Sequence, residues 1–208
     1  VSAGAEDEWS LSYSYEAQGN YSRAIQALNP VVKREPEHEF ARLRLAWLKY
    51  LNRDYNASIR DYQRALAING ESLDAMLGVT LPLLAQGNWR DLVDVLEREA
   101  AIADDDGFRI QVYSDLARVW YEKLERERNA IENWERVLDI DPGYVWAFNG
   151  LGMALAMEGK NEEALAAFRD AVRKAPESAP GYLNLAVHLE RMQRFPDALE
   201  AYEKFLDF

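Results

Sequence analysis

The chain of 208 residues has no cysteine and only two histidines, His38 and His188. Without thiols, disulfides and thiolate metal sites are excluded. The two histidines lie far apart in the sequence, and neither has a second metal ligand at the helical spacing that zinc motifs require. We therefore expect no metal, no cofactor and no histidine-based catalysis, and we interpret both histidines as polar residues of a surface or a groove.

Long apolar runs and positive charge are also scarce. No apolar run reaches the roughly 18 residues of a membrane span, and no signal-peptide pattern is present. Lysine and arginine number 24 against 36 aspartates and glutamates, so the net charge is −12. Such an acidic surface repels phosphate backbones and anionic membranes. We expect a soluble protein that neither binds nucleic acid nor inserts into a membrane.

What the chain does contain is a repeat. Mostly small residues recur at intervals of 34, 34, 38, 34 and 34, at Ala24, Ser58, Leu92, Ala130, Ala164 and Ala198. Four residues after each stands a large apolar side chain, at Leu28, Tyr62, Leu96, Trp134, Phe168 and Tyr202. This period predicts a stack of helix–turn–helix units. Stacks of this kind usually hold other molecules on an extended surface, which favours binding over catalysis.

Local signals place the turns and the helix ends. The expected turns are Gly19-Asn20, Arg53-Asp54, Gly87-Asn88 and Gly159-Lys160-Asn161, and Pro36, Pro142 and Pro176 lie just past expected helix ends. Two prolines fall inside expected helices, where a proline removes a backbone hydrogen bond. We expect Pro82 to kink its helix, and the helix that contains Pro30 to bend or break near Asn29.

The third unit departs from the pattern. Leu92, Thr80 and Glu99 replace smaller residues, and Asp104-Asp105-Asp106-Gly107 adds residues before the fourth unit. The acidic run lacks the ligand spacing of a calcium loop, so a solvated linker is favoured over a calcium site. Because the larger side chains must hold their helices further apart, we expect the pitch or direction of the stack to change between residues 73–106 and 110–208.

The spacing and residue types resemble the tetratricopeptide repeat (TPR) family. The fifth unit carries the fullest match, with Phe148, Leu151, Gly152, Leu155, Ala164, Phe168 and Pro176. The resemblance implies an all-α, right-handed superhelix (an α-solenoid) of six repeats and about twelve helices. The expected repeats are 5–38, 39–72, 73–106 (atypical), 110–144, 145–178 and 179–208 (truncated, without a solvating helix).

Small residues are expected where the two helices of each hairpin come closest. The expected pairs are Ser12 with Ala24, Ala46 with Ser58, Gly152 with Ala164, and Ala186 with Ala198. Gly150-x-Gly152 falls inside an expected helix and lacks the third glycine of a phosphate-binding loop. We therefore interpret both glycines as packing positions.

The resemblance also implies a concave groove that binds a peptide or protein segment. Its positions in the N-terminal half are Trp9, Tyr13, Leu43, Arg44, Trp47, Tyr50, Leu77, Leu81 and Leu84. Its positions in the C-terminal half are Asp115, Arg118, Tyr121, Trp146, Asn149, Met153, Met157 and Asn184. The residues that we expect to contact a partner are Trp9, Tyr13, Arg44, Trp47, Tyr50, Leu81, Leu84, Arg118, Tyr121, Asn149, Met153 and Asn184. The alternative for each is packing between repeats.

The two halves of this groove differ in character. One TPR subclass clamps a C-terminal carboxylate with paired lysine, asparagine and arginine; only Asn149 and Asn184 match here, so we do not expect that clamp. In the N-terminal half, Arg44, Trp47, Tyr50 and Tyr13 are expected to form a pocket with flat apolar walls and one cation. Such a pocket suits an apolar side chain beside an acidic group.

The leading hypothesis is a non-enzymatic adaptor or scaffold that binds an unidentified protein or peptide. Two alternatives remain open: a structural module that self-associates through its ends, and the recognition domain of a larger enzyme. Leu199, Tyr202, Leu206 and Phe208 leave apolar surface at the C-terminal end, so a continuation of the chain or a contact with another chain is expected there. The run 77–84 resembles bacterial TPR proteins, which implies the periplasm or cytoplasm of a bacterium.

Overall fold

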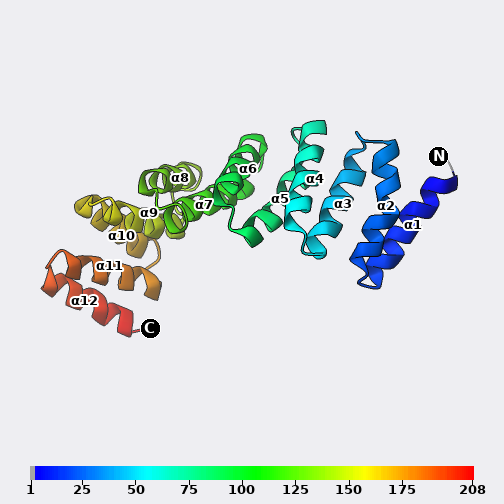
Figure 1. Cartoon of the computed structure of the whole chain (residues 1–208). Coiled ribbons are helices and arrows are strands. Elements are labelled where there is room, and N and C mark those ends of the chain that lie inside the picture. Colours follow the sequence, from blue (N-terminus) through cyan, green and yellow to red (C-terminus); the bar gives the residue numbers. More distant parts are fainter. Residues whose placement is uncertain (1–2) are drawn as a thin grey trace. The chain divides into compact units, whose positions relative to one another are not determined.

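The computed structural model describes residues 3–208, with side chains from residue 8 onward. Twelve α-helices and no strand occupy this part of the chain (Figure 1). The helices are α1 (Ala3–Ala17), α2 (Tyr21–Arg34), α3 (Glu39–Leu51), α4 (Tyr55–Ile68), α5 (Leu73–Gln86), α6 (Trp89–Ile102), α7 (Asp106–Glu122), α8 (Glu127–Ile140), α9 (Val145–Met157), α10 (Asn161–Lys174), α11 (Ala179–Arg191) and α12 (Phe195–Leu206). The expected all-α class is confirmed.

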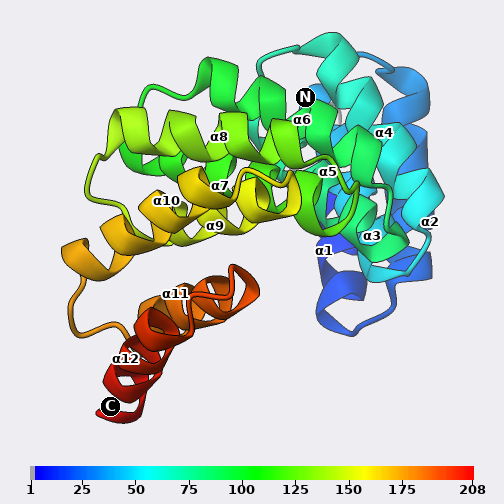
Figure 2. The same ribbon diagram turned by 90° about the vertical axis from the view of Figure 1, so that its left-hand side faces the viewer.

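The chain divides into two compact units, Val1–Ile102 and Ala103–Phe208. Unit 1 holds α1–α6 and unit 2 holds α7–α12, and within each unit successive helices pack side by side (Figures 1 and 2). The odd-numbered helices also contact one another: α3 contacts α5 in unit 1, and α9 contacts both α7 and α11 in unit 2. Each unit therefore has a layer of odd-numbered helices backed by a layer of even-numbered ones.

One backbone feature repeats at every hairpin turn. A residue with positive φ stands at each of six positions, namely Gly19, Arg53, Gly87, Glu125, Gly159 and Gln193. These positions keep the 34-residue period, with the single longer step of 38 between Gly87 and Glu125. Asn20 and Asp54 follow directly and cap the next helix by accepting hydrogen bonds from Arg23 N and Ala57 N. The expected turn positions are confirmed.

Small residues lie at the close contacts within each hairpin. Ser12, Ala24, Ala164 and Ala186 are fully buried, and Ser58 Oγ donates a 2.7 Å hydrogen bond to the Ala46 carbonyl. A Cβ on Gly152 would lie 2.6 Å from the Phe168 ring. On Gly150 it would lie 2.3 Å from the Trp134 indole. Both distances are too short for real atoms, so the packing role expected for Gly150 and Gly152 is confirmed.

The chain does not break near Asn29, whereas the bend given there as the alternative and the kink at Pro82 stay predictions. Helix α2 runs through Pro30 without interruption, and α5 likewise runs through Pro82. Leu28, Val31 and Val32 on both sides of Pro30 are buried in one apolar cluster, which anchors both parts of α2. Packing of this face offsets the missing hydrogen bond, whose loss costs roughly 3 kcal/mol in an isolated helix.

The linker before the fourth hairpin is shorter than expected. Helix α7 already includes Asp106 and Gly107, because Asp105 Oδ2 accepts a hydrogen bond from Phe108 N and caps the helix. Asp106 forms an ion pair with Arg109 one turn later. Two of the three aspartates of the acidic run thus have structural partners. Leu92 and Glu99 of the atypical third hairpin are both buried in α6.

Candidate functional site

A hollow of about 460 Å³ opens in unit 2 between α7, α9 and α11. It brings together five residues singled out in this half of the chain, namely Arg118, Tyr121, Asn149, Met153 and Asn184. A second hollow of about 290 Å³ shares Tyr121, Met153 and Asn184 with the first. It adds Met157, Leu183, Val187, His188 and Arg191. Because the two hollows share these three lining residues, we treat them together and call them the unit 2 groove.

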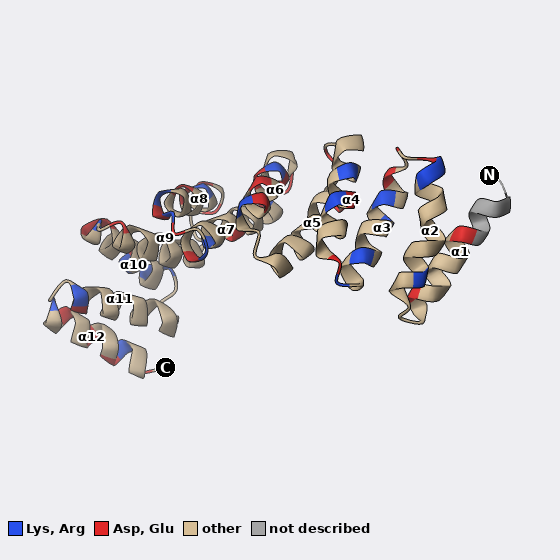
Figure 3. Ribbon diagram, viewed as in Figure 1, with Lys and Arg blue, Asp and Glu red and all other residues tan. Residues whose placement is uncertain are grey.

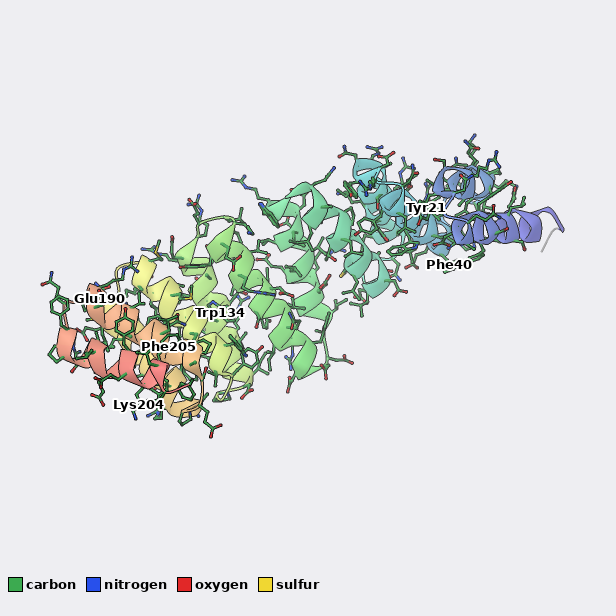
Figure 4. All side chains as sticks on the ribbon, turned by 90° about the horizontal axis from the view of Figure 1, so that it is seen from below. Tyr21, Phe40, Trp134, Glu190, Lys204 and Phe205 are labelled. Carbon is green, nitrogen blue, oxygen red and sulfur yellow. The ribbon has the colours of Figure 1, made fainter. Side chains whose placement is uncertain are left out.

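The wall of the larger hollow depends on Gly150, which has no side chain. The indole of Trp134, from helix α8, reaches the space beside Gly150 on α9 and lines the hollow there. Figure 4 labels Trp134 among the helices of unit 2. Trp146 stands at the rim of the hollow with 65% of its surface exposed. The hollow thus combines aromatic walls with the flexible side chain of Met153, a composition suited to apolar ligand groups.

Two asparagines form the polar part of this groove. Asn184 Nδ2 donates a 3.0 Å hydrogen bond to Asn149 Oδ1, and Asn149 Nδ2 donates to the Val145 carbonyl at 3.3 Å. Asn149 is buried, so these bonds fix the orientation of both amides. The described contacts leave Asn184 with one N–H and its Oδ1 atom for a ligand. That pair of groups matches the hydrogen-bonding pattern of a peptide unit.

Charges in the unit 2 groove are largely balanced. Arg118 forms an ion pair with Asp115 one turn earlier on α7. Burial raises the pKa of Tyr121, Glu127 and Glu122 add to the rise, and Arg191 opposes it. Tyr121 therefore remains a neutral hydroxyl that donates and accepts hydrogen bonds.

The groove positions expected in unit 1 carry apolar and aromatic side chains except for Arg44. We define the unit 1 face as these positions on α1, α3 and α5, which are Trp9, Tyr13, Leu43, Arg44, Trp47, Tyr50, Leu77, Leu81 and Leu84. Tyr13, Trp47, Leu77, Leu81 and Leu84 are exposed, whereas Trp9, Leu43 and Tyr50 are half-buried. The ring centroids of Trp47 and Tyr50 lie 5.7 Å apart.

Arg44 contacts Tyr13 as expected, but it is not a free cation. Its guanidinium carbon lies 3.5 Å from the centroid of the Tyr13 ring. Arg44 Nη2 also forms a 2.7 Å ion pair with Glu16 Oε2, and Trp47 Nε1 donates to Glu16 Oε1 at 3.0 Å. The arginine is buried beneath these contacts. The interpretation of Arg44 as a cation available to an acidic partner group is therefore wrong.

Several residues of these surfaces escaped the sequence interpretation. Phe40 is exposed and its ring stacks on Trp9 with centroids 5.5 Å apart, and Figure 4 labels it at the edge of unit 1. Leu183 and Val187 are exposed in the unit 2 groove. They stand 34 residues after Asn149 and Met153, so the repeat period was the signal that identifies them. Nothing in the spacing pointed to Glu16 as the partner of Arg44.

Among the described residues, no helix is long and apolar enough to cross a bilayer. The described part of the chain also contains no group of three or more histidine, aspartate or glutamate side chains placed to hold a metal ion.

Comparison with protein families gives one match over more than half of the chain. The tetratricopeptide repeat model matches residues 10–73 and 121–179. Among curated proteins, the probable UDP-N-acetylglucosamine–peptide N-acetylglucosaminyltransferase SPINDLY of Hordeum vulgare is 24% identical over 154 residues. The match covers 69% of this chain but only 16% of that relative.

Solved structures show the same fold at low identity. YrrB, described as a TPR protein with an unusual peptide-binding site, is 21% identical with a TM-score of 0.63. The match covers 88% of this chain and 92% of YrrB. MamA is 21% identical with a TM-score of 0.62, and the match covers 85% of this chain and 94% of MamA. A TPR protein from Parabacteroides merdae is 14% identical with a TM-score of 0.63, and the match covers 99% of this chain and 80% of that protein.

Proposed function

The chain belongs to the tetratricopeptide repeat family of protein-interaction scaffolds, and from this premise we propose that it is a non-enzymatic adaptor that holds a segment of a partner protein in a concave groove. The observation that carries the proposal is the unit 2 groove, where five residues singled out from the sequence line one hollow. The net charge of −12 supports a protein partner over nucleic acid. The resemblance of residues 77–84 to bacterial proteins supports the periplasm or cytoplasm of a bacterium.

The chemistry of the unit 2 groove suits an extended peptide. In this proposal Asn184 donates to a carbonyl and accepts from an N–H of the partner backbone, while Asn149 holds its amide in place. Met153 and Trp146 take apolar side chains of the segment. Helix α9 supports the proposal because Trp146, Met153 and Met157 are exposed on a helix whose other face is also apolar and buried. A helix with two apolar faces is normally covered on both.

A peptide library displayed on phage and selected on the purified chain tests this function. Affinities of selected peptides are then measured by calorimetry for the parent chain and for Asn184→Ala and Met153→Ala. We expect each variant to weaken binding about tenfold or more, since hot-spot losses reach about 2 kcal/mol. Asn129→Ala on α8, the same truncation outside the groove, is the matched control. Failure to select any peptide, or unchanged affinity in Asn184→Ala, contradicts the proposal.

A second candidate function follows from the barley relative. That relative is named a glycosyltransferase acting on peptides, and this chain spans 16% of its length. In this alternative the repeats present protein substrates to a catalytic domain of a larger protein. The sequence of the complete gene separates the two candidates, because only the alternative requires a catalytic domain in the same polypeptide.

A third candidate is self-association through the C-terminal end. Leu199 and Leu206 on α12 are 60% and 77% exposed, and Phe195 and Phe208 nearby are also exposed. These side chains form an apolar surface on which a second chain could dock.

A further inference from the structure

We propose that the outer face of α4 binds an acidic segment of a partner protein, whose carboxylates pair with Arg60 and Arg64. This surface belongs to the even-numbered layer of unit 1, so the inference goes beyond the groove proposed for unit 2 and does not depend on it. It rests on three observations: a departure from the repeat pattern, the absence of carboxylates that would neutralise the two arginines, and the net charge of the second repeat.

The first observation is a departure from the repeat pattern at two outward positions of the even-numbered helices. The second and the sixth residue after the recurring position (Ser58 in α4) are exposed on α4, α6, α8 and α12. Helix α4 carries Arg60 and Arg64 there. The other three helices carry a carboxylate and then a cation, namely Asp94 and Arg98 on α6, Glu132 and Arg136 on α8, and Glu200 and Lys204 on α12.

The pair of arginines has a cost in stability. An acidic residue four positions before a basic one stabilises a helix, whereas two like charges at this spacing destabilise it by a similar amount. Neither Arg60 nor Arg64 forms an ion pair or a side-chain hydrogen bond among the described residues, so no contact within the fold offsets this cost. Positions that break a local rule in this way are typical of functional sites.

The second observation is that no carboxylate of α4 neutralises the two guanidinium groups. The other exposed side chains of this helix are amides or a methyl group. Its one carboxylate, Asp61, is buried and already pairs with two cations of α3, Arg42 and Lys49. The contact between α3 and α4 therefore holds a surplus of positive charge, which adds to that of the outer face.

Carboxylates near α4 lie at its two ends. Asp54 caps the first turn by accepting a hydrogen bond from Ala57 N. At the other end, Glu39 accepts hydrogen bonds from Asn69 Nδ2, and Glu71 follows in the loop. The two arginines stand in the middle turns of the helix, so the centre of its outer face is basic.

The third observation is the charge of the second repeat as a whole. Residues 39–72 carry six lysines and arginines against four aspartates and glutamates, whereas each of the other five expected repeats carries more acidic than basic residues. In Figure 3 the charged segments of α4 are mostly blue, while α6 and α8 show red and blue together. The outer face of α4 is thus a basic surface within a chain of net charge −12.

A short acidic segment fits this surface better than a nucleic acid does. Two arginines four positions apart have Cβ atoms about 5–6 Å from each other, and each guanidinium can receive one carboxylate in charge-assisted hydrogen bonds. A short segment meets only this local charge. A long polyanion would also meet the negative field of the other repeats, which repels phosphate groups.

The test compares a short glutamate-rich peptide, its glutamine analogue of equal length and a single-stranded DNA oligonucleotide. Calorimetry is carried out at low ionic strength, because salt weakens exposed charge pairs. We expect the glutamate peptide to bind at least about tenfold more tightly than either of the other two. No binding of the glutamate peptide, equal affinity of the glutamine analogue, or DNA binding that is as tight or tighter overturns the proposal.

Variants locate the site. Arg60→Gln combined with Arg64→Gln should weaken binding of the glutamate peptide at least about tenfold. The matched control is Arg136→Gln combined with Lys204→Gln, which removes two exposed cations from the same repeat position on α8 and α12 and should leave the affinity unchanged. Unchanged affinity in the α4 double variant, or an equal loss in the control, overturns the proposal.

A variant of opposite charge tests the cost in stability. Arg60→Glu restores on α4 the acid-then-base order of α6, α8 and α12. We expect this variant to lose binding of the glutamate peptide while its Tm rises, because the repulsion between like charges is removed. Retained binding or a lower Tm in Arg60→Glu overturns the proposal.

Two further measurements separate this site from other occupants and from unit 2. Asn184→Ala should leave the affinity for the glutamate peptide unchanged, so the outcome here is independent of the function proposed for unit 2. Light scattering on the parent chain and on the α4 double variant should show the same association state. Self-association that the double variant abolishes overturns the proposal, since a second copy would then be the occupant.

Discussion

At the scale of single residues, Trp47 is placed both to contact a ligand and to stabilise the fold. Trp47 is 37% exposed, and its indole N–H donates a hydrogen bond to Glu16, which also forms an ion pair with Arg44. Part of the indole is therefore structural, and part is open to a ligand. This intermediate position differs from both simple expectations, a residue wholly in a groove and a residue wholly between repeats.

Trp47→Ala should weaken binding of a partner segment held on the unit 1 face by about thirtyfold, equivalent to about 2 kcal/mol. The cost in stability should remain below the about 3–5 kcal/mol typical of fully buried tryptophan, because the ring is partly exposed. Circular-dichroism melts and calorimetric binding on the same preparation measure both quantities. A stability loss in the full range, with unchanged peptide affinity, would assign Trp47 to the core alone.

Tyr62 provides a prediction about alkaline pH. Burial, with a smaller contribution from Tyr50, raises the pKa of Tyr62 from 10.0 to about 12. Below pH 10 the phenol is neutral in both the folded and the unfolded chain, so the free energy of unfolding is unaffected. Above pH 10 the unfolded chain releases the proton first, and stability falls until the pH passes about 12.

Tyr62→Phe should therefore lose less stability than the parent chain between pH 9 and pH 12. The expected difference is about 2 kcal/mol, from the 1.36 kcal/mol associated with each pKa unit. Urea unfolding of both proteins across this range measures the difference. Ionisation of the other tyrosines contributes equally to both proteins, so it cancels in the comparison. Parallel curves for the two proteins would show that ionisation of Tyr62 is not suppressed by folding.

At the scale of elements, the six hairpin turns share one backbone conformation although different residue types adopt it. Gly19, Gly87 and Gly159 adopt positive φ without a side-chain clash, whereas Arg53, Glu125 and Gln193 adopt it despite carrying a Cβ. The left-handed conformation costs a non-glycine residue roughly 1–2 kcal/mol. The six turns thus share one conformation at two different energies.

Gln193→Gly should stabilise unit 2 by about 0.5–1 kcal/mol, because relief of the left-handed conformation exceeds the added freedom of the unfolded chain. The reverse change, Gly159→Gln at the preceding turn of the same unit, should destabilise it by a similar amount. Gln193 is exposed and Gly159 has open space around its Cα, so neither change disturbs packing. Denaturant titrations measure both. Stabilisation by both substitutions, or by neither, would contradict this account.

At the scale of the whole molecule, the even-numbered helices differ in how their outer faces are covered. Ile59, Val93, Ile131 and Leu165 occupy equivalent positions along the repeat and are buried. Leu199, at the same position on α12, is exposed. The apolar position that neighbouring helices cover in the earlier repeats is therefore open to solvent on α12.

Changing Leu199→Lys together with Leu206→Lys should abolish any concentration-dependent association of the chain and raise its solubility, because two charges replace the exposed apolar surface. Size-exclusion chromatography with light scattering measures the association state over a range of concentrations. Glu203→Lys on the same helix adds a charge without removing apolar surface and serves as the control. Unchanged solubility and association in the double variant would show that α12 is not an interaction surface.

The sequence by itself determined the number of helices, the turn positions and the small-residue contacts such as Ala46 with Ser58. These features arise from signals within one hairpin, such as a glycine that permits positive φ or a side chain too small to keep two helices apart, and the 34-residue period repeats the signals six times. The resemblance to the TPR family also predicted a shared groove for Arg118, Asn149 and Asn184, and all three line one hollow.

Only the tertiary structure decided how those residues are used. Glu16 neutralises Arg44 from 28 positions away, Trp134 fills the space beside Gly150, and packing on both sides carries α2 through Pro30. The physical reason is that ion pairing, side-chain orientation and burial depend on the distances between neighbouring helices. Those distances are set jointly by every side chain at the contact, so residue spacing along the chain does not encode them.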